Sequence, residues 1–176
     1  RRYLTFAEFK SELAPHFGLG LEGYATWTSP IRKYSDMVNH RLIKAVLTQQ
    51  ACEKPQDEVL ARLQEARRQN RLVERDIADW LYCRYLADKV AENAEFDAEV
   101  QDVMRGGLRV QLLENGASMF VPASTLHPNK DEMQVNADEL AMYIQGERRY
   151  KIGDLVKVKL TEVREETRSI VGQLII

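Results

Sequence analysis

Cysteine, long apolar runs and excess positive charge are all scarce in this 176-residue sequence. The two cysteines, Cys52 and Cys83, lie far apart without a paired motif, which excludes a disulfide framework and a zinc site built on cysteine pairs. No apolar run approaches the ~20 residues of a membrane helix, and no signal-peptide core follows the N-terminal Arg-Arg. A formal net charge of −2 excludes nucleic-acid binding by bulk positive charge but leaves local basic sites open. We therefore expect a reduced, cytoplasmic protein that does not enter membranes.

The composition is that of a folded protein, with 44% hydrophobic and 30% charged residues. The chain opens on Arg1 without an initiating methionine, so we expect it to be a piece of a longer chain. Near residue 93 the spacing of apolar residues changes from a helical period to a period of two. Residues 1–92 hold 15 Lys and Arg against 13 Asp and Glu, whereas residues 93–176 hold 10 against 14. These shifts predict two domains, 1–92 and 93–176.

Three helices are expected in the first domain. The first follows Thr5, which begins a capping box. The second begins at Ser29 as its cap, with Pro30 in the first turn. The third opens at Pro55 and runs to about Val90. Their apolar stripes consist of Phe6, Phe9 and Leu13 in the first, of Ile31, Tyr34, Val38, Leu42 and Ala45 in the second, and of Leu60, Leu63, Leu72, Ile77, Trp80, Leu81 and Tyr85 in the third.

The second domain carries the pattern of five short strands. Asn115-Gly116 marks a tight hairpin between the second and third of them. The stretch 124–149 before the fourth strand has weak strand signal, and a short helix is expected near 137–143. Five strands with such an insertion suit a Greek-key barrel of the OB type. The expected fold class is therefore α+β, a helical segment followed by a five-stranded OB-fold barrel.

The segment from Tyr24 to Tyr34 is the strongest candidate site. A helix start capped by Ser29 would leave backbone N–H groups and the positive end of the helix dipole free for an anion. Arg32 and Lys33 add two cations in the first turn, where they oppose the dipole by roughly a few tenths of a kcal/mol unless an anion is bound. On spacing alone, a plain capped helix with solvated cations is the somewhat stronger interpretation.

The residues themselves add a family resemblance. Thr28-Ser-Pro-Ile-Arg-Lys-Tyr-Ser-Asp36, followed by Asn39-His-Arg41, closely resembles the ribonuclease II family of processive 3′-to-5′ exoribonucleases, in the C-terminal part of the catalytic (RNB) domain. The resemblance continues through Arg71–Tyr82 and into the strand-rich half, which resembles an S1 RNA-binding domain, a variant of the OB fold. It covers nearly the whole chain, and the Thr-Ser-Pro-Ile-Arg block is its most specific part.

The resemblance implies hydrolysis of single-stranded RNA to nucleoside monophosphates from the 3′ end, as in mRNA degradation. It implies magnesium bound by an aspartate cluster that this sequence lacks, so no metal ligand and no cofactor are expected in this chain, which alone should be inactive. Arg32 would be catalytic by stabilising charge on the scissile phosphate. The other residues of this half expected to contact RNA are Thr28, Ser29, Lys33, Tyr34, Arg67, Arg71 and Glu74. For Arg67 and Arg71, a solvated basic face is an equally good interpretation.

Barrels of the S1 type bind single strands by base stacking and by cations along the backbone. Here the outward cations expected to contact phosphates are Arg105, Arg109, Lys157 and Lys159. Many members carry aromatic residues where this sequence has Gly106 and Arg109, so the stacking platform is reduced, although a guanidinium plane can also stack. Phe120 could be a stacking residue or a core residue, and assignment to the core is the somewhat stronger interpretation. We expect modest RNA affinity with a steep salt dependence.

Two other functions stay open at this point. The chain could be a non-catalytic single-stranded RNA-binding or regulatory module, or a scaffold whose long helix binds another protein. The Thr28–Tyr34 block favours the exoribonuclease, because a pure binding module has no need of it. The full-length enzyme is expected to be monomeric, and the isolated chain to self-associate through exposed apolar surface.

Overall fold

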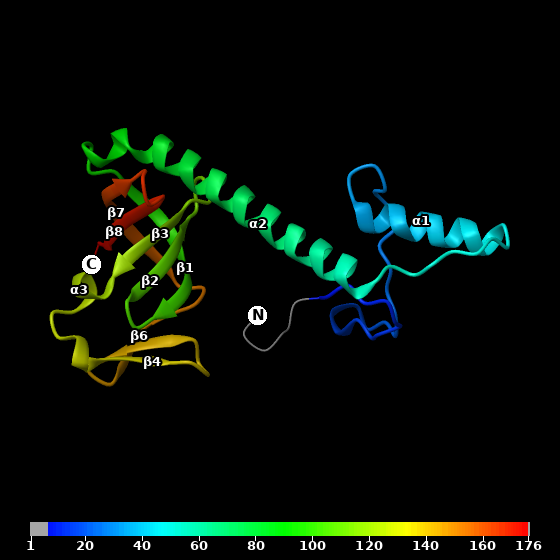
Figure 1. Ribbon diagram of the computed structural model, residues 1–176. Helices are drawn as coiled ribbons and strands as arrows, with labels where there is room; N and C mark the ends of the chain where they lie inside the picture. The colour runs from blue at the N-terminus through cyan, green and yellow to red at the C-terminus, as the bar shows by residue number, and fades with distance from the viewer. Residues whose placement is uncertain (1–6, 176) are drawn as a thin grey trace. The chain divides into compact units, whose positions relative to one another are not determined.

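The computed structural model describes residues 7–175 and consists of two compact units, Arg1–Leu72 and Val73–Ile176 (Figure 1). The first unit contains helix α1 (Tyr34–Leu47) and the first half of helix α2 (Asp57–Leu86). The third predicted helix is thus confirmed as α2, and a 3-10 turn, Asp88–Val90, follows it. The predicted division at residue 93 follows the change of apolar period between α2 and the first strand, and stays a prediction of domain limits. Within residues 7–175, no helix combines the length and the apolar character that crossing a bilayer requires.

The second unit is built on a closed barrel with the strand order β1-β2-β3-β8-β7. β3 and β8 pair in parallel, and the other neighbours pair antiparallel. All five predicted strands are present, and the barrel confirms the α+β class with an OB-type fold. The barrel strands are β1 (Glu95–Met104), β2 (Gly107–Leu112), β3 (Ser118–Pro122), β7 (Leu155–Arg164) and β8 (Ser169–Leu174).

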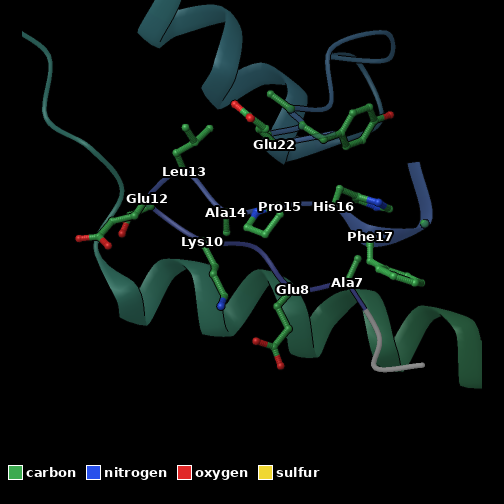
Figure 2. Close-up of a pocket in the computed structure, with 15 residues that line it drawn as sticks. Ala7, Glu8, Lys10, Glu12, Leu13, Ala14, Pro15, His16, Phe17 and Glu22 are labelled. Atoms are coloured by element: carbon green, nitrogen blue, oxygen red, sulfur yellow. The ribbon is translucent and has the colours of Figure 1, made fainter. Parts of the chain in front are cut away.

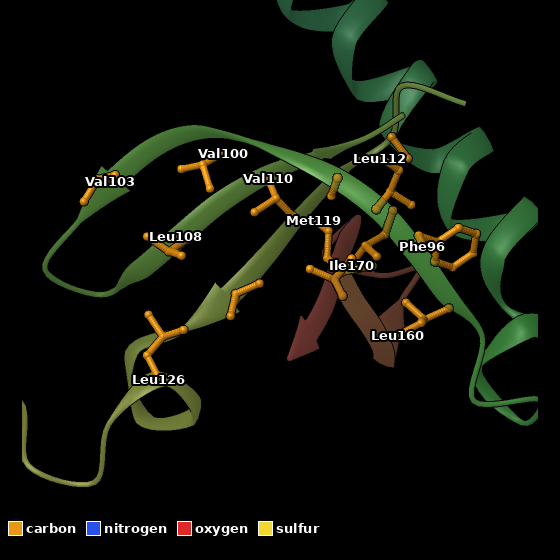
Figure 3. Close-up of a cluster of buried hydrophobic side chains, with 14 of the residues drawn as sticks. Phe96, Val100, Val103, Leu108, Val110, Leu112, Met119, Leu126, Leu160 and Ile170 are labelled. Atoms are coloured by element: carbon orange, nitrogen blue, oxygen red, sulfur yellow. The ribbon is translucent and has the colours of Figure 1, made fainter. Parts of the chain in front are cut away.

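Buried and exposed residues alternate along the strands, and the buried side chains fill the barrel interior. In β2, Leu108, Val110 and Leu112 are buried, while Arg109 is exposed between them. Figure 3 shows these side chains within the buried cluster, with Val110 near Met119 of β3 and Leu108 near Val103 of β1. Burial of such aliphatic side chains contributes about 1.5–3 kcal/mol each. The residues between these buried positions, which are polar or half-buried, therefore lie on the outer side of β2 and β3.

The last turns of α2 close one end of the barrel. Cys83 and Leu86 are fully buried in the same apolar cluster as the strands. Burial raises the pKa of the Cys83 thiol, and the nearby Asp79 and Glu165 add to this rise, so the thiol stays protonated. The Tyr82 hydroxyl donates a hydrogen bond of 2.9 Å to the carbonyl of Asn115, in the loop between β2 and β3.

Replacing Tyr82 with phenylalanine should lower the free energy of unfolding of the barrel unit by about 1 kcal/mol, because the Asn115 carbonyl loses its donor. Urea unfolding followed by circular dichroism measures this change. Tyr85→Phe is the matched control, since Tyr85 is exposed on the same helix. An equal loss in both variants would contradict the role of the Tyr82 hydrogen bond.

The insertion before β7 is a three-stranded sheet, β4 (Met133–Asn136), β5 (Ala141–Ile144) and β6 (Glu147–Lys151). Figure 1 shows it at the end of the barrel opposite the last turns of α2. The prediction of a helix near 137–143 is wrong, because these residues form a turn and the start of β5. The Asn136 side chain accepts hydrogen bonds from the N–H groups of Asp138 and Glu139, at 3.0 and 3.2 Å, and begins a turn. Leu140 then takes a left-handed conformation with φ of 54°, which ends the turn, and the next residues pair as strands.

The N-terminal segment differs most from expectation. Residues 7–13 are not helical, and Thr5 and Phe6 lie outside the described residues. The Ala7 carbonyl accepts a hydrogen bond of 3.3 Å from Gln64, and the Phe9 ring lies 5.7 Å from the Arg67 guanidinium. These contacts to α2 replace the local helix that the capping-box spacing predicted.

A pocket occupies this N-terminal segment, and its lining residues all fall between Ala7 and Ala25 (Figure 2). The predicted site residues begin further along, at Thr28, and so do not line it. The first unit also exposes large apolar side chains. Self-association through them stays a prediction. The most exposed are Leu13, Phe17, Ile31, Val46 and Leu47.

Candidate functional site

Helix α1 begins at Tyr34, so the prediction of a helix capped by Ser29 is wrong. Pro30 does start a helical turn, as its fixed φ favours. The Ser29 carbonyl accepts hydrogen bonds from the N–H groups of Arg32 and Lys33, at 3.2 and 2.9 Å. Lys33 then takes an extended conformation, with φ of −120° and ψ of 112°, and separates this turn from α1. The Ser29–Lys33 turn is therefore a unit of its own that precedes the helix.

This turn changes which groups are available to an anion. The Arg32 N–H, expected to be free, is occupied by the Ser29 carbonyl. The side chains of Arg32 and Lys33 are exposed, and the Arg32 guanidinium lies 3.5 Å from the Ser29 hydroxyl oxygen. No carboxylate pairs with Arg32 among the ion pairs of the described residues. The cations, rather than a cradle of backbone N–H groups, are what this turn presents.

Asp36, in the first turn of α1, anchors the Ser29–Lys33 turn. It is fully buried, and its carboxylate accepts hydrogen bonds from the Ser29 N–H at 2.8 Å and from the Ser35 hydroxyl at 3.2 Å. The pKa of Asp36 is lowered, first by the nearby Thr26 hydroxyl, which itself donates to the Ser35 hydroxyl at 3.3 Å, and then by the hydrogen bonds from Ser29 and Ser35 and the charge of Lys33, against the effect of burial. The carboxylate is thus held ionised, and no ion pair joins it to a cation among residues 7–175. Asp36 was not among the site residues predicted from the sequence, although an acid in the first turn of a helix is a visible signal.

Two more residues on the same face of α1 hold the segment before the turn. The Asn39 amide donates a hydrogen bond of 2.7 Å to the carbonyl of Thr26. A ring nitrogen of His40 lies 3.0 Å from the carbonyl of Trp27, and the two rings stack with centroids 3.8 Å apart. Asp36, Asn39 and His40 stand three and four residues apart, the spacing of one helix face. We call these three residues the α1 clamp.

The predicted RNA contacts of this segment fall on both sides of the turn. Thr28 and Tyr34 are exposed beside Arg32 and Lys33, whereas Ser29 is half-buried and its N–H and carbonyl are occupied. The structure therefore brings four of these side chains to the surface of one short segment. Their contact with RNA stays a prediction.

The other predicted residues of the helical half lie along α2. Arg67 and Arg71 are exposed and stand one helical turn apart in the first unit. The Arg67 guanidinium faces the Phe9 ring. Glu74 is exposed and belongs to the second unit. Contact of these three residues with RNA stays a prediction.

On the barrel, the outer side of β2 and β3 carries a cation and an aromatic ring side by side. Arg109 of β2 is the register partner of Phe120 of β3, and Arg105 lies in the turn just before β2. Phe120 is half-buried and alternates with the buried Met119 and Val121, so its assignment to the core is wrong. We call Arg105, Arg109 and Phe120 the β2–β3 face.

The structure gives the β2–β3 face an open aromatic surface beside a cation. A side chain at Gly106 would come within 3.7 Å of the tip of the Phe120 ring, so the glycine keeps this edge uncovered. Base stacking on an aromatic ring together with a cation is the combination that single-strand binding uses. The period of two in β3 was the signal that could have placed Phe120 outside.

Lys157 and Lys159 lie elsewhere on the barrel. Lys157 is the register partner of Asp97 and Lys159 that of Glu95, and the Lys157 amine lies 4.0 Å from the Asp97 carboxylate. Arg109 pairs with β1 five residues further along, at Asp102, which is roughly 17 Å away at about 3.3 Å per residue. The two predicted groups of barrel cations are therefore separate, and both have acidic register partners in β1.

The described residues of this chain do not form a catalytic metal site. Between residues 7 and 175, no group of three His, Cys, Asp or Glu side chains is arranged to hold an ion. No step of a reaction is therefore assigned to a metal on these residues.

Comparison with known proteins matches both halves of the chain. The family model of the RNB domain matches residues 1–49, and that of the S1 RNA binding domain matches residues 89–174. Exoribonuclease 2 of Haemophilus influenzae is 86% identical over 175 residues, which are 99% of this chain and 27% of that protein. Exoribonuclease 2 of Pasteurella multocida is 76% identical over 99% of this chain and 26% of its own length. The chain spans about a quarter of the length of these curated relatives.

Solved structures show the same fold at lower identity. The apo form of Mycoplasma genitalium RNase R has a TM-score of 0.77 at 22% identity, covering 99% of this chain and 28% of that one. The same RNase R in complex with ribose methylated single-stranded RNA gives the same values. The Dss1 exoribonuclease of Candida glabrata has a TM-score of 0.66 at 16% identity, over 92% of this chain and 19% of that one.

Proposed function

Because this chain belongs to the ribonuclease II family, with an RNB segment followed by an S1 RNA-binding domain, we propose that it is the C-terminal part of an exoribonuclease. The full-length protein would hydrolyse single-stranded RNA from its 3′ end and release nucleoside monophosphates. This chain would supply Arg32 to the reacting phosphate and the barrel to the RNA strand. The observation that carries the proposal is the exposed Arg32 on a turn that the α1 clamp fixes, within the segment that matches the RNB domain.

Arg32 suits a phosphate that gains charge during hydrolysis. Its guanidinium is exposed, has a long contact to Ser29 as its one polar side-chain contact within residues 7–175, and can offer two parallel donors to phosphate oxygens. A cation placed in advance stabilises developing charge without reorganising at the moment of reaction. Lys33 beside it would add a second, less directional contact to the RNA backbone.

The β2–β3 face would hold the strand at a distance from the reaction. Phe120 offers a ring for stacking, and Arg109 and Arg105 offer charge to phosphates. Lys157 and Lys159 are retained as proposed phosphate contacts; their register partners in β1 are acidic, as is Asp102, the partner of Arg109. We retain Arg67, Arg71 and Glu74 as proposed contacts of the full-length protein.

The magnesium that the family implies would be bound by residues beyond those of this chain. We therefore expect the purified chain to bind single-stranded RNA at low salt and to leave it intact when magnesium is added. Fluorescence anisotropy with a labelled oligonucleotide measures binding, and denaturing gel electrophoresis measures cleavage. Mononucleotides released by the purified chain in a magnesium-dependent reaction would contradict the proposed division of the active site. Failure to bind RNA at low salt would contradict the proposed role of the barrel.

The second candidate function is a non-catalytic single-stranded RNA-binding module. It is favoured by the barrel unit, which has its own closed core and an Arg109–Phe120 pair on its surface. The two functions predict different effects of removing the Arg32 side chain. A binding module predicts that loss of Arg32 changes only affinity, whereas the exoribonuclease predicts a loss of turnover.

A further inference from the structure

Asp36 combines a charge, complete burial and contacts to a single neighbouring segment. It is the charged side chain that is buried among residues 7–175. Burial of a carboxylate costs free energy unless hydrogen bonds satisfy its oxygens. Asp36 does not cap α1, whose N-cap is Lys33 without a side-chain hydrogen bond; its carboxylate accepts instead from Ser29, before the helix, and from the Ser35 hydroxyl. The buried charge therefore acts on the segment before the helix.

The contacts of Asp36 lead directly to Arg32. The carboxylate accepts the N–H of Ser29 at 2.8 Å. The carbonyl of the same residue accepts the N–H groups of Arg32 and Lys33, at 3.2 and 2.9 Å. Ser29 is thus held on one side by the helix and on the other by the turn. A charge-assisted hydrogen bond is roughly twice as strong as a neutral one, so the carboxylate holds Ser29 more strongly than an uncharged side chain would.

We propose that Asp36 is a positioning residue for Arg32: its buried carboxylate fixes the Ser29 peptide to α1 and so fixes the turn that carries the guanidinium. This inference rests on the proposed function, in which Arg32 contacts the reacting phosphate. A turn outside regular structure has freedom that a helix lacks, and a catalytic group must be held within about 0.5 Å of its productive position. Asp36 would transfer the rigidity of α1 to the turn.

The α1 clamp supplies its own control. Asn39 holds Thr26 by one hydrogen bond of 2.7 Å, on the same face of the same helix. This bond goes to the backbone carbonyl of Thr26, so its loss should loosen the segment while the hydrogen bond from the Ser29 N–H to the Asp36 carboxylate stays in place. Asn39→Ala therefore destabilises the same segment but keeps the charge of Asp36. Asp36→Asn removes the charge that holds the Ser29–Lys33 turn.

The test is a double-mutant cycle in the full-length protein that contains this chain, with single-turnover cleavage of a single-stranded oligonucleotide as the measurement. Asp36→Asn should lower the cleavage rate constant about 10- to 100-fold, the scale of a misplaced catalytic group, and should change RNA affinity little. In an Arg32→Ala background, Asp36→Asn should have almost no further effect, because the group it positions is gone. Asn39→Ala should have the same small effect in both backgrounds.

The outcomes separate this proposal from the proposed function. If Arg32→Ala lowers cleavage but Asp36→Asn lowers it by the same factor with and without Arg32, Asp36 is structural and the positioning role is wrong. If Arg32→Ala leaves cleavage unchanged, the role of Arg32 itself fails, and the positioning role fails with it. Should Asp36→Asn not fold, as judged by circular dichroism, Asp36→Ser is measured in the same cycle, since it also removes the charge; it should lower the cleavage rate constant only when Arg32 is present.

Discussion

Replacing Arg32 with alanine in the full-length protein should lower the turnover number on single-stranded RNA by about 100- to 1,000-fold, the usual effect of removing one group that stabilises transition-state charge. The Michaelis constant should change much less, because the exposed guanidinium is one of several cations proposed to contact the RNA backbone. Steady-state and single-turnover kinetics on the same oligonucleotide measure the two effects. Arg32→Lys should recover only part of the rate, since a lysine cannot offer two parallel donors.

Lys44→Ala is a charge-matched control for this experiment. Lys44 is exposed, as Arg32 is, but it lies in the last turn of α1 and outside the Ser29–Lys33 turn. Its loss should leave the cleavage rate constant close to that of the parent protein. An Arg32→Ala variant that loses affinity while keeping its single-turnover rate would favour the non-catalytic binding module.

Replacing Phe120 with alanine should weaken binding of single-stranded RNA to this chain by about 10- to 100-fold, since stacking on an aromatic side chain contributes about 1–3 kcal/mol per base. The slope of the logarithm of affinity against the logarithm of salt concentration should stay the same, because no charge is lost. Fluorescence anisotropy at several salt concentrations measures both quantities. Phe120→Tyr, which keeps the ring, should bind nearly as well as the parent.

Two further variants make the Phe120 result specific. Arg109→Ala should weaken binding and also reduce the salt slope by about one, as expected for one phosphate contact. Leu155→Ala removes an exposed apolar side chain from β7 and should leave affinity unchanged. Equal losses from Phe120→Ala and Leu155→Ala would mean that the β2–β3 face does not bind the RNA.

The barrel could be predicted from the sequence because each strand carries its own alternation. Leu108, Val110 and Leu112 mark the inner side of β2 without reference to any other element. Phe120 was misplaced because an isolated aromatic residue suits a core and a stacking surface equally well. The burial of its sequence neighbours, Met119 and Val121, shows that Phe120 lies on the outer side of β3.

The helical half was less predictable because its local signals are overruled by contacts from distant residues. Ser29-Pro30 is a good helix start, and it does begin a turn, but Asp36 holds the Ser29 N–H and α1 starts later. Residues 7–13 have helical spacing, yet they contact α2 through Ala7 and Phe9. The specific motif identified the candidate site from the sequence, whereas the α1 clamp that holds it became visible only in three dimensions.

The end of the barrel that α2 closes has a consequence for how this domain can be exchanged between proteins. Cys83 and Leu86 precede β1 in the chain, but they complete the interior that the strands enclose. A gene segment beginning at β1 would encode all five strands and still leave an opening where these side chains belong. A recombination event that transfers a stable barrel domain must therefore also carry the codons for the last turns of the preceding helix. The inherited unit is thus longer than the five strands alone.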